Sequence, residues 1–177
     1  MIKVSSNIKL ELIRKSHAKE LFALTDSNRK YLRKWLPWVD GNVSVNETMA
    51  FIIRSIRQNK RNDGFNCAVL YKGKISGVIG LTEISRFNNR TEIGYWLGEE
   101  FTGKGIMTKS CKALADYCFK KLKVNRIIIR CEVNNKKSRM IPERLRFFKQ
   151  GILKHDGIRN GRYLNLIQYS VYKNEWK

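Results

Sequence analysis

The stretch that decides the fold covers residues 90–110, RTEIGYWLGEEFTGKGIMTKS. An apolar segment typical of a strand leads into a turn with Gly103 and Gly105, and an amphipathic helix follows from Ile106. Glycine adopts positive φ without steric cost and lets a ligand approach the main chain closely. The start of the helix points its unpaired N–H groups and the positive end of its dipole into this turn. The pattern therefore predicts a binding site for an anion such as phosphate.

The turn does not fit two familiar nucleotide-binding motifs. Gly98, Gly103 and Lys104 have the spacing of a P-loop, but Gly105 occupies the position of the Ser or Thr that holds magnesium. Two glutamates inside the loop would also repel a triphosphate. A Rossmann fingerprint needs a third glycine, which is absent here. A tight turn that binds no ligand remains the alternative.

Three motifs taken together, Glu92–Leu97, Gly103–Gly105 and Asn135–Ser138, resemble the GNAT superfamily of acetyl-CoA-dependent N-acetyltransferases. The resemblance is closest to its RimJ/RimL branch, which acetylates the N-termini of ribosomal proteins. It extends over nearly the whole chain, through Leu10–Ile13, Trp35–Trp38, Gly77–Leu81, Tyr169–Tyr172 and Glu175–Trp176. It implies a single GNAT domain over residues 1–177, with an α+β fold in which helices flank a mixed, mostly antiparallel sheet.

The hydrophobic pattern also predicts an α+β fold, because strands dominate the middle of the chain and helices cover them. Strands are expected over residues 8–13, 65–71, 75–84, 90–97, 124–133, 150–156 and 162–173, and helices over 29–36 and 137–148. Ser16 is expected to cap an early helix, and Ser44 with Glu47 makes a capping box before another. Lys72 and Gly73 predict a hairpin turn.

The charge of the chain is unusual: 36 lysines and arginines against 15 acidic residues give a formal net charge of +21. The excess is uneven, because residues 101–177 contain 19 basic and 5 acidic residues. Such a field attracts anionic partners, which include the phosphates of CoA, RNA and acidic protein substrates. The alternative is that frequent lysine on solvated faces reflects the coding bias of the genome.

No feature of the sequence predicts export or membrane insertion. Met1–Ser6 lacks the apolar core of a signal peptide, and no run approaches the roughly 20 apolar residues of a transmembrane helix. A cytoplasmic location is therefore expected. The four cysteines form no C-x-x-C pair and have no histidine at ligand spacing, so we expect small core residues rather than zinc ligands or disulfides. His17 and His155 are expected to be structural or surface residues.

The resemblance implies acetyl-CoA as the cosubstrate and no metal. Its motif positions assign cofactor binding to Trp96, Leu97, Gly103, Lys104, Gly105, Ile106, Met107, Thr108, Asn135 and Ser138. The implied reaction moves the acetyl group from the thioester to a primary amine by direct attack in a ternary complex. The enzyme must then remove a proton from the amine, hold the amine against the carbonyl and stabilise the oxyanion.

Glu92 is the first candidate for the general base, because it matches the strand position from which histone-acetylating members of the superfamily present their catalytic glutamate. The reference pKa of a glutamate is about 4.3, whereas that of the protonated amine is about 8. Glu92 therefore needs a water relay or a raised pKa to deprotonate the amine. The alternative is a solvent-facing carboxylate paired with a lysine or arginine. Glu83, at the end of the preceding strand, is the second candidate.

Two positions depart from the superfamily pattern. Many members use a tyrosine seven residues after the asparagine to protonate the CoA thiolate, but this chain has Pro142 there. RimL-like enzymes resemble this chain in a serine three residues after the asparagine, which makes Ser138 the candidate acid and leaves Asn135 to bind the pantetheine arm. An ordinary polar loop is the alternative for this motif. Arg146 stands where the family usually has glycine. The tight turn normally found at this position is therefore in doubt for this chain.

Tyr31, Trp35 and Trp38 form the predicted acceptor-binding cluster. The matching segment of RimJ/RimL enzymes lies beside the acceptor groove, and rigid aromatic rings suit an extended peptide end, although simple packing over the sheet is an equal alternative. The favoured acceptor is a protein N-terminus, and the charge favours an acidic ribosomal protein as the partner. The alternatives are a polyamine or aminoglycoside acceptor, or a non-catalytic module that binds CoA or RNA. A homodimer is left open.

Overall fold

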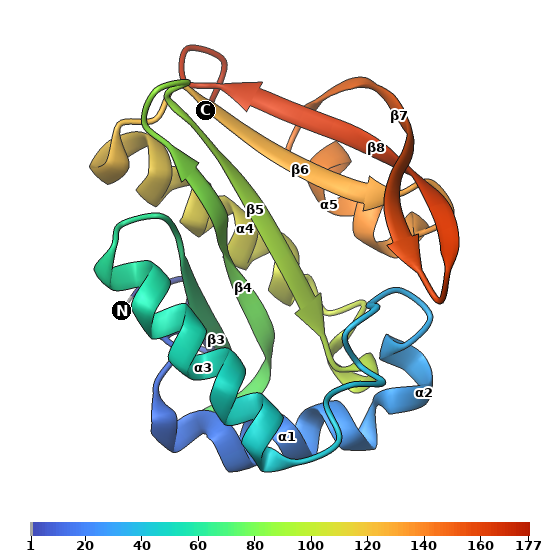
Figure 1. Cartoon of the computed structure of the whole chain (residues 1–177). Helices are drawn as coiled ribbons and strands as arrows, with labels where there is room; N and C mark the ends of the chain where they lie inside the picture. Colours follow the sequence, from blue (N-terminus) through green and yellow to red (C-terminus); the bar gives the residue numbers. More distant parts are fainter. Residues whose placement is uncertain (1) are drawn as a thin grey trace.

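The chain forms one sheet of eight strands in the computed structural model, which describes residues 2–177. The strands lie in the order β1-β2-β3-β4-β5-β6-β8-β7 (Figure 1). Their bounds are Ile2–Lys3 (β1), Ile8–Leu12 (β2), Phe65–Tyr71 (β3), Lys74–Ser85 (β4), Arg90–Leu97 (β5), Arg126–Glu132 (β6), Phe148–Arg159 (β7) and Arg162–Tyr172 (β8). All neighbours pair antiparallel except β5 and β6, so the prediction of a mixed, mostly antiparallel sheet is confirmed.

Helices cover both faces of this sheet. Their bounds are Lys15–His17 (η1), Ala18–Ser27 (α1), Arg29–Leu32 (α2), Val45–Lys60 (α3), Glu99–Phe101 (η2), Ile106–Tyr117 (α4), Cys118–Leu122 (η3) and Lys136–Arg144 (α5). α1 and α3 pack on one face around Ile52 and Val78, whereas α4 and α5 pack on the other around Leu114 and Ile129 (Figure 1). Each long helix is amphipathic, so it buries one side against the sheet and leaves its charged side in water.

The parallel strands β5 and β6 are joined over three residues only. Arg90–Glu92 pairs with Arg126–Ile128, and beyond these residues the two strands diverge (Figure 1). The edge of Ile93–Leu97 that faces β6 therefore has no strand partner among residues 2–177, although β4 pairs with its other edge. An unpaired edge offers backbone N–H and C=O groups to a ligand. The divergence opens a gap in the sheet, which we call the wedge.

β7 carries a bulge near its centre. Its pairing register with β8 shifts between Leu153 and Gly157, and His155 in this stretch has a left-handed φ of 54°. A bulge bends the strand and changes the direction of the neighbouring side chain. Asp156 consequently reaches Arg130 on β6, with 3.0 Å between Oδ2 and Nη1.

The boundaries predicted from the sequence agree at most strands and differ at three helices. The helix expected over residues 29–36 ends at Leu32, and the chain continues in turns. Ser16 does not cap α1: it lies in the 3-10 helix η1, and α1 begins at Ala18 after a residue whose side chain makes no capping bond. The last helix ends at Arg144 instead of residue 148, because Arg146 takes a left-handed φ of 58° and Phe148 already belongs to β7. The tight turn therefore forms with arginine in the place of glycine.

Two local predictions are confirmed in full and one in part. Ser44 caps α3, but its hydroxyl accepts a hydrogen bond from the N–H of Asn46 at 3.1 Å and not from that of Glu47, as a capping box requires. Lys72 and Gly73, with φ values of 51° and 82°, form the hairpin turn between β3 and β4. The four cysteines are buried free thiols in the core: Cys67, Cys111, Cys118 and Cys131.

Both histidines have structural partners. His17 is buried and accepts a hydrogen bond from Nε of Arg14 at 3.1 Å, whereas His155 stacks on Tyr163 with 5.1 Å between ring centroids. Within residues 2–177, no group of three or more His, Cys, Asp or Glu side chains is placed to hold a metal ion. In the same part of the chain, no helix has the length and apolar character needed to span a bilayer.

Candidate active site

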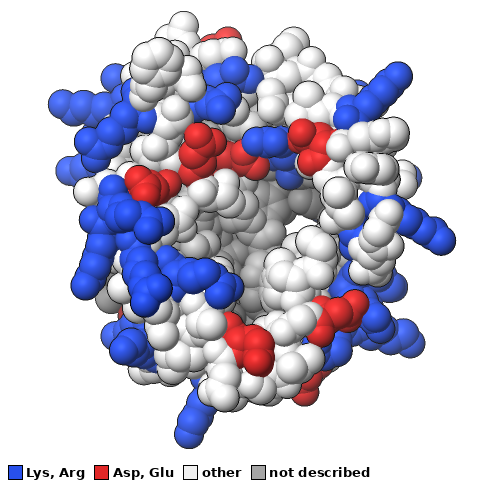
Figure 2. Space-filling model, in the orientation of Figure 1, with Lys and Arg blue, Asp and Glu red and all other residues white. Residues whose placement is uncertain are grey.

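A cleft of about 350 Å³ lies at the open end of the wedge, between the end of β5 and the start of α5. Trp96 reaches it from the face that α1 and α3 cover and Tyr95 from the face that α4 and α5 cover, since successive strand residues point to opposite faces. The cleft therefore passes through the sheet. Figure 2 shows the molecule hollowed at the centre of one face. The other residues that line the cleft are Tyr31, Leu32, Trp35, Leu36, Leu97, Phe101, Thr102, Gly103, Gly105, Ile106, Met107, Thr108, Asn135, Lys137, Ser138, Met140, Ile141 and Arg144.

The turn before α4 presents a row of free backbone amides. Gly103 and Gly105 have φ values of 76° and 70°, in the left-handed region that favours glycine. None of the six N–H groups from Gly103 to Thr108 donates to another described residue. These amides lie at the positive end of the α4 dipole, so the turn has both the donors and the potential to bind phosphate. We call Gly103–Thr108 the amide cradle.

The wedge and the amide cradle fit the acetyl-CoA that the resemblance implies. The pantetheine arm contains two amides that match the unpaired edge of β5, and the pyrophosphate matches the cradle. Nine of the ten residues predicted to bind the cofactor line the cleft: Trp96, Leu97, Gly103, Gly105, Ile106, Met107, Thr108, Asn135 and Ser138. Lys104 does not, and its Nζ instead lies 5.7 Å from the ring centre of Phe101.

Ser138 on α5 is held at three points. Its N–H donates to Oδ1 of Asn135 at 3.1 Å, which makes Asn135 the N-cap of the helix. Its hydroxyl donates to Sγ of Cys131 at 3.2 Å, and its carbonyl accepts from the hydroxyl of Tyr95 at 3.0 Å. Burial raises the pKa of Tyr95 and of Cys131, so both groups keep their protons. The serine that lines the cleft is therefore fixed in place.

Glu92 lies at the tip of the wedge and not in the wall of the cleft. Its Oε2 lies 2.6 Å from Nη2 of Arg130, whose Nη1 contacts Asp156 at 3.0 Å. Burial alone would lower the pKa of Arg130, but the nearby carboxylates of Glu92 and Asp156 raise it above its ordinary value. Glu92 thus makes the ion pair with an arginine that its alternative role as a solvent-facing carboxylate predicts. With 20% of its side chain exposed, Glu92 still has access to water.

Glu83, the second candidate base, lies outside the cleft on the rim of another hollow. Its side chain is 55% exposed and lies 3.9 Å from Arg90. Glu83 and Glu92 are direct partners in the β4–β5 pairing, so this hollow begins one strand away from the tip of the wedge. The structure therefore brings the two candidate bases close together but does not place either one in the wall of the cleft.

The second hollow has a volume of about 560 Å³ and lies between α3 and the central strands. Arg54, Arg57 and Arg61 line it, together with Phe51, Ser55, Gln58, Asp63, Asn66, Thr82 and Glu83. Arg61 pairs with Asp63 at 2.8 Å. Arg54 and Arg57 make no ion pair with any residue of the described chain. We call this site the arginine hollow.

The predicted acceptor residues divide into two groups. Tyr31 and Trp35 line the cleft, whereas Trp38 does not. The ring of Trp38 packs on Trp96 instead, with 5.7 Å between the ring centroids. Trp38 therefore supports the wall of the cleft from behind. We call Tyr31, Trp35 and Trp38 the aromatic cluster.

Cationic side chains from distant elements face the aromatic cluster. Nζ of Lys137 on α5 lies 5.4 Å from the ring centre of Tyr31. The guanidinium of Arg159 on β7 lies 6.0 Å from the ring centre of Trp35 and also pairs with Glu132 on β6. Cation–π contacts of this kind join the segment after α1 to the other side of the wedge.

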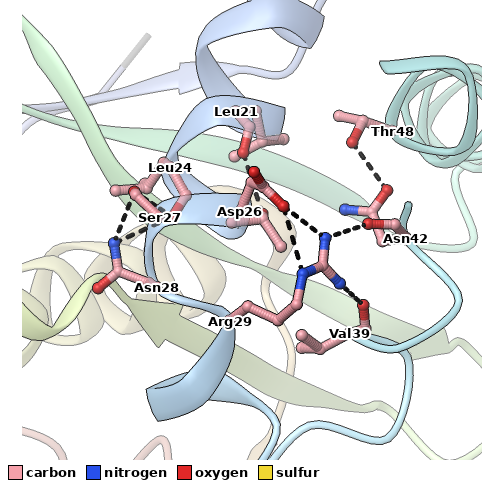
Figure 3. A network of polar contacts seen from close by, with 10 residues as sticks. Leu21, Leu24, Asp26, Ser27, Asn28, Arg29, Val39, Asn42 and Thr48 are labelled. Atoms are coloured by element: carbon pink, nitrogen blue, oxygen red, sulfur yellow. Dashed lines mark hydrogen bonds and ion pairs between the residues drawn. The ribbon is translucent and has the colours of Figure 1, made fainter. Parts of the chain in front are cut away.

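A polar network fastens the segment that carries the aromatic cluster (Figure 3). Arg29 donates to the carbonyl of Val39 at 2.6 Å and to that of Asn42 at 2.9 Å. Asn28 accepts a hydrogen bond from the N–H of Glu99 at 2.7 Å, just before the amide cradle. Side chains at the start of this segment therefore determine its conformation and connect it to the cofactor side.

Sequence reasoning did not identify five residues of the site. Tyr95 and Cys131 contact Ser138, whereas Arg130, Asp156 and Arg159 make the ion pairs between β5, β6 and β7. Alternation along β6 places Arg130 on the face opposite Cys131, which is a signal that the sequence contains. No comparable signal exists for Asp156, whose direction depends on the β7 bulge.

The chain matches the family described as "Acetyltransferase (GNAT) domain" over residues 7–147. It is 35% identical to YdaF of Bacillus subtilis, whose provisional name is ribosomal N-acetyltransferase, over 99% of this chain and 96% of YdaF. It is 28% identical to the ribosomal-protein-serine acetyltransferase of Escherichia coli, over 96% of this chain and 94% of that protein.

Solved structures show the same fold. RimL, described as a ribosomal L7/L12 α-N-protein acetyltransferase with coenzyme A joined to one of its cysteines by a disulfide, gives a TM-score of 0.93 at 29% identity over 97% of each chain. The microcin C7 self-immunity acetyltransferase MccE, in complex with acetyl-CoA and AMP, gives 0.92 at 32% identity over 96% of this chain and 94% of that one. The chain therefore belongs to the GNAT family and is an N-acetyltransferase with acetyl-CoA as its cosubstrate.

Proposed function

We propose that this enzyme acetylates the N-terminal α-amine of an acidic protein, with a ribosomal protein as the first candidate, in the cytoplasm. The observation that carries the proposal is the cleft through the sheet, which joins the amide cradle to the aromatic cluster. An extended peptide end and a cofactor arm can thus meet from opposite faces. Relatives named after ribosomal-protein acetylation align with nearly the whole chain, which supports this acceptor class.

The chemistry of the reaction favours an α-amine over a lysine side chain. An ammonium group must lose its proton before it attacks, and the reference pKa is about 7.7–8.0 for an α-amine but about 10.4 for lysine. At neutral pH about a tenth of α-amines, and less than about 0.1% of lysines, is unprotonated. A weak base therefore suffices for an α-amine. Glu92, fixed by Arg130, takes this role directly or through water, and Glu83 is the second candidate.

Ser138 is the proposed general acid. Acetyl-CoA supplies an activated thioester whose sulfur leaves as a thiolate. Ser138 lines the cleft, and its hydroxyl already donates to a sulfur atom, Sγ of Cys131, at 3.2 Å. In RimL, coenzyme A forms a disulfide with one of the protein's own cysteines, so the CoA sulfur can lie beside a thiol in this fold. Asn135, which caps the same helix, is the candidate partner of the pantetheine arm.

The arginine hollow supports an acidic acceptor. Arg54 and Arg57 are guanidinium groups without acidic partners in the described chain, and such groups bind carboxylates through charge-assisted hydrogen bonds. The hollow begins one strand away from Glu92, because Glu83 on its rim pairs with Glu92 across β4 and β5. Figure 2 shows basic side chains gathered over α3 beside the central hollow. A peptide with its amine at Glu92 would place acidic residues that follow near these arginines.

The proposal is tested by CoA release with three acceptors: an acidic peptide with a free N-terminus, the same peptide with amides for its carboxylates, and spermidine. We expect the acidic peptide to react fastest at about 50 mM salt. Its advantage should shrink at about 500 mM, where the Debye length falls to a few ångströms. If spermidine reacts fastest at every salt concentration, the proposed acceptor is wrong.

A polyamine is the second candidate acceptor, because carboxylates gather on the acceptor side. Glu92, Asp156 and Glu132 outnumber Arg130 and Arg159, the arginines that pair with them. The spermidine N(1)-acetyltransferase of Escherichia coli is 29% identical over 104 residues, which are 59% of this chain. The net charge of +21 opposes the approach of a polycation, so this candidate ranks second.

A further inference from the structure

Pro142 lies inside α5 and removes one of its hydrogen bonds. Proline has no N–H, so it cannot donate to the carbonyl four residues earlier, which belongs to Ser138. The proline ring also crowds that carbonyl and pushes it away from the helix axis. A carbonyl inside the protein needs another donor, because an unpaired one carries a desolvation cost.

The missing donor comes from β5. The hydroxyl of Tyr95 donates to the carbonyl of Ser138 at 3.0 Å. The hydroxyl of Ser138 lies 3.4 Å from that of Tyr95 and 3.2 Å from Sγ of Cys131. The same side chain of β5 therefore contacts both the backbone and the hydroxyl of Ser138.

The rest of α5 is tied to the sheet by separate contacts. Arg139 donates to the carbonyl of Val133 at 2.8 Å, and the hydroxyl of Tyr169 donates to Glu143 at 2.6 Å. These contacts lie on the β6 and β8 side of the helix and do not include the carbonyl of Ser138. Loss of the Tyr95 hydroxyl should therefore free the turn that carries Ser138 and leave the helix attached.

We propose that Tyr95 is a positioning residue, whose hydroxyl replaces the helix hydrogen bond that Pro142 lacks and so fixes the turn that places Ser138 in the wall of the cleft. This inference rests on the proposed role of Ser138 as the general acid. It assigns to Tyr95 no proton transfer of its own. The relation between a strand residue and a proline 47 positions later is specific to this pair of residues.

A double-mutant cycle tests the inference. Tyr95→Phe removes the hydroxyl and keeps the ring, and Pro142→Ala supplies an N–H at the position where the helix lacks one. We expect Tyr95→Phe to lower the melting temperature by a few degrees and kcat about tenfold, with a smaller change in the KM for acetyl-CoA. In the double variant, the backbone N–H that alanine supplies at this position should pair with the carbonyl of Ser138. The kcat of the double variant should then lie within about threefold of the Pro142→Ala value, and its melting temperature within about a degree.

Three outcomes would overturn the inference. Tyr95→Phe with unchanged kcat and melting temperature would show that the hydroxyl has no role. A double variant that regains its melting temperature but not its kcat would make Tyr95 a proton donor instead of a positioning residue. If Tyr95→Phe does not fold, Pro142→Ala and the double variant still differ by the hydroxyl alone, and a large difference in kcat between them would contradict the inference.

A second measurement does not depend on any acceptor. A maleimide should label Cys131 faster in Tyr95→Phe, because the turn that shields its thiol is loosened, and the double variant should return to the slow rate. Cys67, which is buried elsewhere in the core, is the internal reference. This labelling pattern without acetylation of any amine would contradict the proposed function but support the Tyr95–Pro142 relation. Equal labelling of Cys131 in all variants would overturn that relation.

Discussion

The proposed cofactor side and the proposed acceptor side of the cleft are built from different groups. On the cofactor side, the groups available to a ligand are backbone amides: the amide cradle and the unpaired edge of β5. On the acceptor side they are side chains, which ion pairs between β5, β6 and β7 and the polar network of Arg29 hold in place. A backbone site follows from a local pattern of glycines and strand residues, whereas a side-chain site requires contacts between distant segments.

The two sides should therefore respond differently to substitution. Exchange of a side chain in the amide cradle leaves its N–H donors in place, so that a change of backbone conformation is needed to remove binding. On the acceptor side each substitution removes one contact and changes catalysis or the choice of amine.

Gly105→Val should abolish cofactor binding. Valine strongly disfavours the φ of 70° found at Gly105, so the turn must change and its amides no longer converge. Millimolar CoA should raise the melting temperature of the wild type, because it binds only the native state, and should leave that of the variant unchanged. Gly73→Val is the matched control, since Gly73 has a φ of 82° in a hairpin distant from the cradle and equally open surroundings. A CoA-induced shift in Gly105→Val would contradict a backbone-built site.

Glu92→Gln should lower kcat by about 10²-fold with little change in the KM for acetyl-CoA, which is the usual effect of removing a general base. The amide keeps the shape of the side chain and loses its charge. Steady-state kinetics with the acidic peptide provide the measurement. Arg130 and Asp156 should remain paired, so the fold should be preserved.

Glu83→Gln is the matched control for this experiment, because Glu83 pairs directly with Glu92 across the strands but lies on the rim of the arginine hollow. We expect it to keep kcat within about threefold of the wild type. A large loss in Glu83→Gln together with normal turnover in Glu92→Gln would transfer the role of base to Glu83.

The double substitution of Arg54 and Arg57 by glutamine should raise the KM for the acidic peptide about tenfold at low salt and hardly change that for its amide counterpart. Both side chains are exposed, so the fold should tolerate the change. The double substitution of Lys120 and Lys121 by glutamine is the matched control, since it removes the same charge from η3, which lies outside the arginine hollow. An equal effect of the two double substitutions would show that only net charge matters.

Arg146→Gly should give the smallest effect, a stabilisation of about 0.5–1 kcal/mol. Arginine pays a conformational energy for the left-handed φ, and glycine does not. This gain exceeds the free-energy cost of the additional backbone entropy that glycine loses on folding. For a chain of this size the melting temperature should rise by about 1–4 °C, with unchanged kcat. Arg144→Gly provides the comparison, because it lies within α5 and should destabilise the protein. A lower melting temperature in Arg146→Gly would show that the arginine side chain contributes to the turn.

The same difference explains how much the sequence could predict. The amide cradle was predictable because Gly103, Gly105 and the following helix lie within a few residues, and the geometry depends on backbone conformation alone. Most strands were predictable for the same local reason. The boundary of α5 was not, because Arg146 adopts a conformation that the sequence pattern assigns to glycine.

The acceptor side could not be predicted from local patterns. Arg130 binds one carboxylate 38 residues earlier and another 26 residues later, and the second depends on a bulge that places His155 in a left-handed conformation. Tyr95 lies inside the most informative motif, but its contact with Ser138 follows from the proline at position 142. Such contacts become apparent only when the order of the strands is known.

The short contact between β5 and β6 has a further consequence for the life of the enzyme. Hydrogen bonds join β1–β5 and β6–β8 over three residue pairs, so a bound ligand on the free edge of β5 acts as an additional strand within the sheet. Both acetyl-CoA and the CoA that remains after transfer can fill this position, and each should protect the chain against local opening and proteolysis. We expect the cellular pool of CoA to control how long each molecule of the enzyme survives, in addition to how fast it works.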